Sequence, residues 1–140
     1  MYAQNENKNQ IKENSNTDNV EIILQLEKQI SITIWIQTIG KIMEVLLLTK
    51  LFLKDEEAKH DPYERNLVEG VWIQTIGQIL EAIGVTREVL SNEEPVRLEA
   101  ATMANIGDWL QGIGATYESY AGKQIIAEDR EGLVTNIFVP

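Results

Sequence analysis

A ten-residue segment recurs three times along the chain, and this repeat constrains the fold more than any other feature of the sequence. The copies are Trp35–Glu44, Trp72–Glu81 and Thr102–Gln111. The first two share the letters WIQTIG at an offset of 37 residues, and the second and third share Ile-Gly and a later Ile-Gly-x-Thr at an offset of 30. A chain built from copies of one segment is expected to stack similar structural units.

The spacing of apolar residues inside the copies predicts α-helices. These residues recur at alternating intervals of three and four, which places them in one stripe along a helix. The stripes are Ile36, Ile39, Met43 and Leu46; Ile73, Ile76, Leu80 and Ile83; and Met103, Ile106, Leu110, Ile113, Tyr117 and Tyr120. The segment Ile30–Ile36 alternates like a strand and is rich in β-branched residues, but the repeat favours a helix there too.

Three candidate helix starts precede the three copies. In each, a side-chain oxygen is followed three residues later by Glu, which is the arrangement of a capping box. The boxes are Asp18–Glu21, Asp61–Glu64 and Ser91–Glu94. They predict helices near 19–54, 62–90 and 93–121, with Gly122 ending the third. Because the connections are short, we expect an all-α fold, an antiparallel three-helix bundle of three diverged repeats whose apolar stripes converge on one core.

The composition of the two ends predicts a division into three parts. Residues 1–17 hold Ile11 as their only aliphatic residue, so we expect a disordered polar tail there. Residues 18–122 form the helical domain. Residues 123–140 are apolar but do not continue the third stripe, so we expect a separate short segment that docks on the bundle or binds a second copy.

Glycines recur at matching positions inside the predicted helices. The pairs are Gly77 with Gly84 and Gly107 with Gly114. Glycine in a helix costs about 0.5–1 kcal/mol relative to alanine, so we expect compensation from the close approach of another helix. In the first copy Gly40 is present but Leu47 stands at the second position, so that helix is expected to pack less closely. A kinked or switching helix is the alternative.

Two tryptophans and two glutamines are candidate interaction residues. Trp35 and Trp72 lie one residue before the apolar stripe, and Gln37 and Gln74 recur with them. Aromatic residues at the edge of a stripe, with a free indole N–H, are typical of both bundle rims and interfaces. These residues are therefore expected either to pack within the bundle or to contact a partner, and the glutamines either to bridge helices or to face solvent.

Residues suited to catalysis or metal binding are few. The chain has no cysteine, one histidine and a net charge of -10. These counts exclude disulfides, cysteine nucleophiles and multi-histidine metal centres, and the charge disfavours nucleic acid. Glu56 and His60 could hold a divalent ion or form a solvated turn, and the acidic run 55–69 could bind a basic partner or simply face water. Glu81 and Asp108 are scattered acids, so we predict no enzyme activity, no cofactor and no metal.

The apolar stretch Ile30–Leu53 is long enough to cross a bilayer. Lys41 and Glu44 lie near its centre, and each would cost about 2.5–3.5 kcal/mol in a spanning helix. Spanning is therefore disfavoured, and we expect a helix of the bundle. No secretory signal is visible, which favours the cytoplasm without excluding non-classical export.

The pattern WIQ-x-IG followed by a second IG resembles an uncharacterised family of repetitive proteins from Bacillus-like Firmicutes, whose domain has no known function. The resemblance covers residues 31–122 and is most specific at Trp72–Thr86, which reads WIQTIGQILEAIGVT. It weakens where Leu47 replaces the second glycine and where Thr102 replaces the tryptophan. The resemblance implies a non-enzymatic bacterial repeat protein and supplies no catalytic residues.

Together these features predict a non-catalytic helical repeat protein that acts as a scaffold or protein-interaction module, binding a protein partner or itself. The alternative is a membrane-active or toxin-like protein that inserts the apolar segment 30–53.

Overall fold

The computed structural model describes the backbone of residues 2–138 and the side chains of residues 19–132. Three long helices account for nearly all of the described chain: α1 (Tyr2–Lys54), α2 (Pro62–Leu90) and α3 (Glu94–Phe138). A single-turn 3-10 helix, η1 (Ala58–His60), lies between α1 and α2. Residues 2–138 contain no strand, so the all-α prediction is confirmed, and Ile30–Ile36 is helical.

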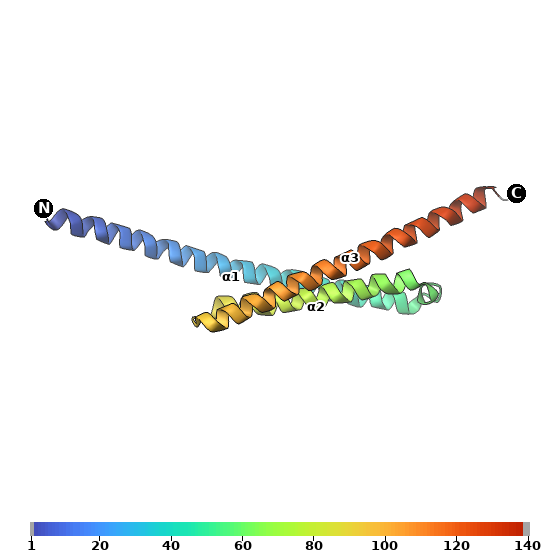
Figure 1. Ribbon diagram of the computed structural model, residues 1–140, viewed down its shortest axis with the longest axis horizontal. Coiled ribbons are helices and arrows are strands. Elements are labelled where there is room, and N and C mark those ends of the chain that lie inside the picture. Colours follow the sequence, from blue (N-terminus) through green and yellow to red (C-terminus); the bar gives the residue numbers. More distant parts are fainter. Residues whose placement is uncertain (1, 139–140) are drawn as a thin grey trace.

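The middle helix, α2, holds the molecule together. It packs antiparallel against α1 and antiparallel against α3, whereas α1 and α3 make no contact with one another within the described residues. Figure 1 shows the first part of α1 and the last part of α3 extending beyond α2 in opposite directions. The three helices therefore form two successive pairs, α1 with α2 and α2 with α3.

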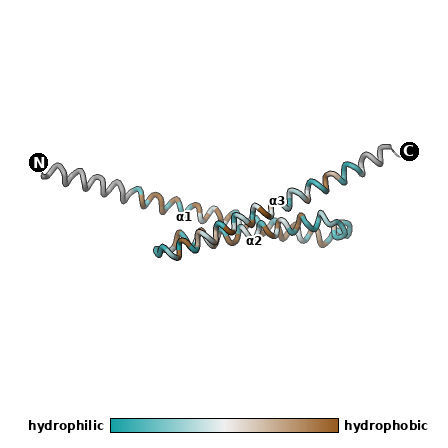
Figure 2. The backbone as a smooth tube through the Cα atoms, in the orientation of Figure 1, coloured by the Kyte–Doolittle hydropathy of each residue, from teal (hydrophilic) through white to brown (hydrophobic). Residues whose placement is uncertain are grey.

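The expectation that the apolar stripes converge on one core is wrong. On α1 the stripe residues lie outside, with Ile36 65% and Met43 58% exposed. On α2 and α3 the stripe lies at the edge of a contact between helices. Leu80 and Leu110 are therefore half-buried, whereas Ile76 and Ile106 are exposed. Figure 2 shows apolar residues along the middle of α1, where it emerges from its contact with α2. The helices meet instead mainly through glycine, alanine, valine and hydroxyl-bearing residues.

The contact between α1 and α2 uses the same repeat positions on both helices. The residues buried there on α1 are Ser31, Ile34, Thr38 and Val45, and the residues 37 positions later on α2 are Val68, Val71, Thr75 and Ala82, all buried. Because the two helices are antiparallel, this is one face of the repeat packed against a second copy of itself. We call it the threonine face.

The contact between α2 and α3 uses a second face, which carries the glycines. A Cβ added at Gly77 would lie 2.6 Å from the carbonyl oxygen of Gly107, and one at Gly70 would lie 2.9 Å from that of Gly114. A Cβ at Gly84 would lie 2.6 Å from the amide nitrogen of Ala104. There is no room for a side chain at these positions. We call this the glycine face.

The two faces lie on nearly opposite sides of α2. With 3.6 residues per turn, the threonine face and the glycine face are roughly 150° apart around the helix axis. This separation explains why α1 and α3 do not touch. Gly40 belongs to the glycine face of α1, which no helix covers, and a Cβ there would meet nothing within 4 Å. The packing role expected for Gly40 is therefore wrong.

The start of α2 agrees with the predicted cap Asp61, whereas α3 begins at Glu94, three residues after the predicted cap Ser91. The Asp61 side chain accepts a hydrogen bond from the Tyr63 amide at 2.7 Å, with Pro62 in the first turn. The Ser91 hydroxyl accepts one from the Glu93 amide at 3.2 Å, just before α3 begins. Both side chains thus satisfy backbone donors near a helix N-terminus.

Two predicted helix ends are wrong. The structure begins α1 at Tyr2, not at the Asp18 box, because residues 2–17 contain no glycine or proline and include good helix formers such as Gln, Glu and Lys. Gly122 does not end α3, which continues to Phe138, because no described glycine adopts the positive φ of a helix C-cap. The expected domain boundaries at 17 and 122 thus fall inside helices. The division into tail, domain and docking segment stays a prediction, and the side chains of 133–140 lie outside the described residues.

The glycine face predicts opposite effects of alanine at two glycines. Gly77→Ala should lower the free energy of unfolding by about 1–3 kcal/mol, because the methyl group would meet the backbone of α3. Gly40→Ala should raise it by up to about 1 kcal/mol, because the site is open and alanine is the better helix former. Chemical denaturation followed by circular dichroism measures both. Equal effects of the two substitutions would contradict close packing at Gly77.

Candidate functional site

The two tryptophans of the repeat join α1 to α2. The indole N–H of Trp35 donates to Thr86 Oγ1 at 2.8 Å, and that of Trp72 donates to Thr49 Oγ1 at 3.0 Å. The two bonds are equivalent, because Trp72 and Thr86 stand 37 residues after Trp35 and Thr49. Each of the two tryptophan residues is 39% exposed. In both tryptophans the indole N–H thus bonds to the neighbouring helix, while part of the side chain is exposed at the surface.

Each accepting threonine also bonds to its own helix. Thr86 Oγ1 donates to the Ala82 carbonyl and Thr49 Oγ1 to the Val45 carbonyl, both at 2.7 Å. Because the hydroxyl proton is used in this bond, the lone pairs of the oxygen are free to accept the indole N–H of the neighbouring helix. Ser31 adds a third contact, with its Oγ 3.0 Å from Thr86 Oγ1.

The two candidate glutamines have different environments. Gln37 is exposed on α1, whereas Gln74 is buried on α2 and its Nε2 donates to the Glu118 carboxylate of α3. A second bridge joins the same helices, because Gln111 Nε2 donates to Glu81 Oε2 at 2.7 Å. Glu81 also accepts from Gln78 Nε2 at 3.0 Å. Its carboxylate thus links helices.

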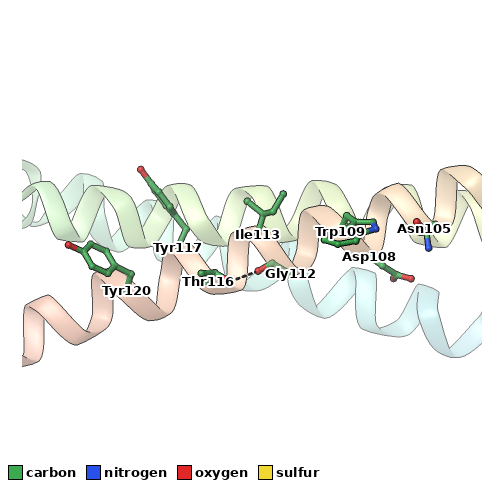
Figure 3. A pocket seen from close by; sticks show the side chains of 8 residues that line it. All are labelled: Asn105, Asp108, Trp109, Gly112, Ile113, Thr116, Tyr117 and Tyr120. Atoms are coloured by element: carbon green, nitrogen blue, oxygen red, sulfur yellow. Dashed lines mark hydrogen bonds between the residues drawn. The ribbon is translucent and has the colours of Figure 1, made fainter.

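A shallow apolar groove runs along the outer side of α3 (Figure 3). All of its lining residues come from this one helix. They are Asn105, Asp108, Trp109, Gly112, Ile113, Thr116, Tyr117 and Tyr120. Trp109 is 69% exposed, and Asp108 is the one charged side chain among these residues. The sequence analysis did not predict this groove. The second and third copies of the repeat are offset by 30 residues, and this offset relates Thr116 of the groove to Thr86 of α2.

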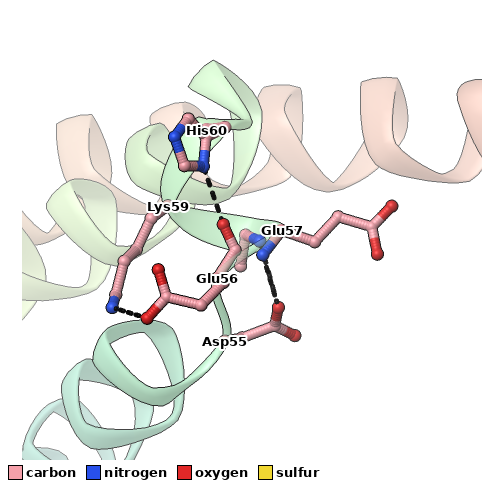
Figure 4. Close-up of polar contacts among 6 residues, drawn as sticks. Asp55, Glu56, Glu57, Lys59 and His60 are labelled. Carbon is pink, nitrogen blue, oxygen red and sulfur yellow. Dashed lines mark hydrogen bonds and ion pairs between the residues drawn. The ribbon is translucent and has the colours of Figure 1, made fainter.

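In the connection between α1 and α2, Glu56 and His60 take part in the contacts of a turn (Figure 4). Glu56 Oε1 pairs with Lys59 Nζ at 2.7 Å, and His60 Nδ1 lies 2.8 Å from the Glu56 backbone oxygen. Asp55 Oδ1 accepts from the amides of Glu57 and Ala58. Among the side chains the structure describes, no group of three or more metal-ligating residues occurs. These contacts shape a turn.

Several carboxylates gather where this connection approaches the later part of α3. Burial raises the pKa of Glu64 above its ordinary value, and repulsion by Asp61, Asp55 and Asp129 raises it further. Asp129 belongs to α3, so the acidic run and α3 influence each other electrostatically. The ionised form of Glu64 is thus disfavoured in the folded protein.

Comparison of the chain with protein-family models, curated proteins and solved structures gives no match.

The indole–threonine bonds predict a loss of stability in one of two matched variants. Thr86→Val removes the acceptor used by Trp35 and Ser31, and should lower the free energy of unfolding by about 0.5–3 kcal/mol. Thr116→Val changes the equivalent threonine of α3, which is exposed and bonds only to Gly112. Thermal unfolding of dilute protein should leave Thr116→Val near the wild type. Equal midpoints for Thr86→Val and the wild type would contradict a stabilising role of the bonds.

The raised pKa of Glu64 predicts the direction of a pH effect. Because the folded state holds this proton more tightly than the unfolded chain, its contribution to stability is lost as the pH rises above the ordinary value of 4.5 through the folded pKa. Glu64→Gln should therefore raise the thermal midpoint at neutral pH, and the advantage should vanish below pH 4.5. Glu69→Gln, an exposed change on the same helix, controls for the loss of one charge. A gain that is independent of pH would refute this origin.

Proposed function

We propose that the protein is a non-catalytic helical repeat protein that acts as an interaction module, binding itself or a protein partner through the outer helices. The observation that carries the proposal is the exposure of large apolar side chains along both of them. On α1 these include Ile36, Ile39 and Leu47, and on α3 Trp109 and Ile113, all more than half exposed. Contiguous apolar surface of this kind marks sites of association.

The way the helices pack accounts for this surface. Since the two internal contacts bury mainly serine, threonine, glycine, alanine, glutamine and valine, with Ile34 as the one large aliphatic residue among the buried side chains described, most of the larger aliphatic residues stay outside. Covering them with a second protein surface would remove apolar area from water, which favours association. The arrangement therefore suits a scaffold whose helices present apolar faces outward.

The roles of the carboxylates support the non-catalytic part of the proposal. Glu81 accepts hydrogen bonds from Gln78 and Gln111, so it acts as a structural bridge. Asp108 is exposed at the edge of an apolar groove on one helix. Three further parts of the proposal stay predictions. They are the absence of a cofactor, a cytoplasmic location and the family resemblance.

A second candidate function is action on membranes, and one observation favours it. Among the described residues, the segment Asn19–Lys54 of α1 is the one helix long and apolar enough to cross a membrane by length and composition. Only 22% of its most apolar window is buried, so this segment is not a covered core helix. Lys41 and Glu44 form an ion pair with an N–O distance of 2.9 Å, yet burying both in a bilayer remains costly.

Two measurements on the purified full chain separate these functions. By light scattering, the proposal predicts a mass above the 15.9 kDa of one chain that rises with protein concentration. By flotation with phosphatidylcholine vesicles, it predicts that the protein stays with the soluble fraction. A constant monomer mass together with quantitative flotation would contradict the proposal and favour the membrane function.

A matched variant identifies which surface causes any flotation. Leu47→Lys places a charge at a position of α1 that is 63% exposed, so the fold should persist. If α1 enters the bilayer, this variant should lose flotation. If the wild type does not float, Leu47→Lys should stay with the soluble fraction as well.

A further inference from the structure

The groove on α3 occupies a defined position in the repeat. Thirty residues before Asn105 and Gly112 stand Thr75 and Ala82 of the threonine face of α2, and thirty residues before Thr116 stands Thr86, which accepts the indole bond of Trp35. On α2 this face is covered by α1, and Ala82 is 1% exposed. On α3 the equivalent residues are exposed. The groove therefore includes part of the threonine face of the third repeat, without a covering helix.

The threonine face is complementary to itself. In the contact between α1 and α2, Trp35 bonds to Thr86 while Trp72 bonds to Thr49, so exchanging the two copies reproduces the same pair of bonds. The contact thus has approximate two-fold symmetry, with Ile42 and Ile79 at its midpoint. A face that pairs with its own copy is suited to an isologous contact.

The backbone and hydroxyl geometry of this face is already formed on α3. Thr116 Oγ1 donates to the Gly112 carbonyl at 2.8 Å, as Thr86 does to Ala82 and Thr49 to Val45 (Figure 3). Its remaining lone pairs point to an uncovered surface. Trp109 stands at the midpoint position, 30 residues after Ile79.

We propose that α3 pairs antiparallel with α3 of a second copy through this groove, in the arrangement by which α1 and α2 pair within one chain. The inference rests on the proposed interaction function and names the partner. Both internal contacts join a face to the same kind of face, threonine to threonine and glycine to glycine. Since α1 and α2 use their threonine faces on one another, α3 has the one uncovered threonine face among the described residues.

The chemistry of the groove fits a symmetric pair. Thr102 replaces the tryptophan of the other copies, so the indole bond to Thr116 is not repeated. Instead the two Trp109 rings would meet near the two-fold axis, where paired aromatic rings bury a large apolar area. The same symmetry brings the two Asp108 carboxylates near each other, and their repulsion limits the affinity.

Two glycine variants test which surface associates. Neither Gly112 nor Gly40 has an atom within 4 Å of an added Cβ, so arginine at either should leave the chain folded. Gly112→Arg places a charge in the proposed contact and should make the protein monomeric by light scattering, with unchanged helicity. Gly40→Arg, on the uncovered glycine face of α1, should associate like the wild type. Association that survives Gly112→Arg, or is lost only in Gly40→Arg, would overturn the inference.

Cysteine cross-linking tests the register, because the chain has no cysteine of its own. In the symmetric pair, residue 102 of one copy lies opposite residue 116 of the other. An equal mixture of Thr102→Cys and Thr116→Cys should therefore form a mixed disulfide under mild oxidation. Each variant alone should not, because its two cysteines would be about 20 Å apart along the helices. Cross-linking of each variant with itself would indicate a parallel pair and refute the arrangement.

Charge distinguishes a second copy from a basic partner. Asp108→Asn removes the repulsion at the axis and should strengthen self-association several-fold, and added salt should act in the same direction on this chain of net charge -10. Weaker association in Asp108→Asn would contradict the pairing. If the wild type stays monomeric and binds no partner, the interaction function itself fails. If it associates and Gly112→Arg has no effect, only the α3 pairing fails.

Discussion

The close approach of backbones at Gly77 and Gly107 is the contact on which the rest of the structure depends. With no side chain between them, α2 and α3 lie near enough for Gln74 to reach Glu118 and for Gln111 to reach Glu81. This contact occupies one side of α2, so α1 packs on the other, through the threonine face. Two distinct faces on one central helix produce a chain of helix pairs, where a single enclosed core had been expected.

Packing through small and polar residues leaves the larger apolar residues to the outer surface. In most globular proteins an apolar stripe faces the core, but here Ile39, Ile76 and Ile106 are exposed at equivalent positions of the three repeats. The fold is thus held by hydrogen bonds, backbone contacts and a few buried valines, and much of its apolar surface stays exposed. Each outer helix also keeps one repeat face uncovered, the glycine face on α1 and the threonine face on α3.

The repeat, the three helices and the starts of α2 and α3 could be predicted because they depend on local spacing and capping. The faces through which the helices pack could not be predicted in this way. A hydropathy pattern gives more weight to isoleucine than to threonine or alanine, so it assigned the isoleucines to the core. The row Ala100, Gly107, Gly114 and Ala121 lies along α3 at intervals of seven, so a search for small residues would have found the α3 side of the contact. Gly122 was wrongly predicted to end α3. Nothing in the local sequence distinguishes a glycine inside a helix from a glycine at the end of a helix. Of the candidate residues, Trp35 and Trp72 were found, whereas Trp109 and Thr116 were missed because the third copy lacks the motif's tryptophan.

The most direct test of this account is a nuclear Overhauser spectrum of the protein with isotope-labelled glycine. We predict cross-peaks between the α-protons of Gly77 and Gly107 and between those of Gly70 and Gly114, because these backbones are in contact. Gly40 should show no cross-peak to another labelled glycine of the same chain. A spectrum without the Gly77–Gly107 cross-peak would show that the helices do not meet through their glycines and would contradict the central claim.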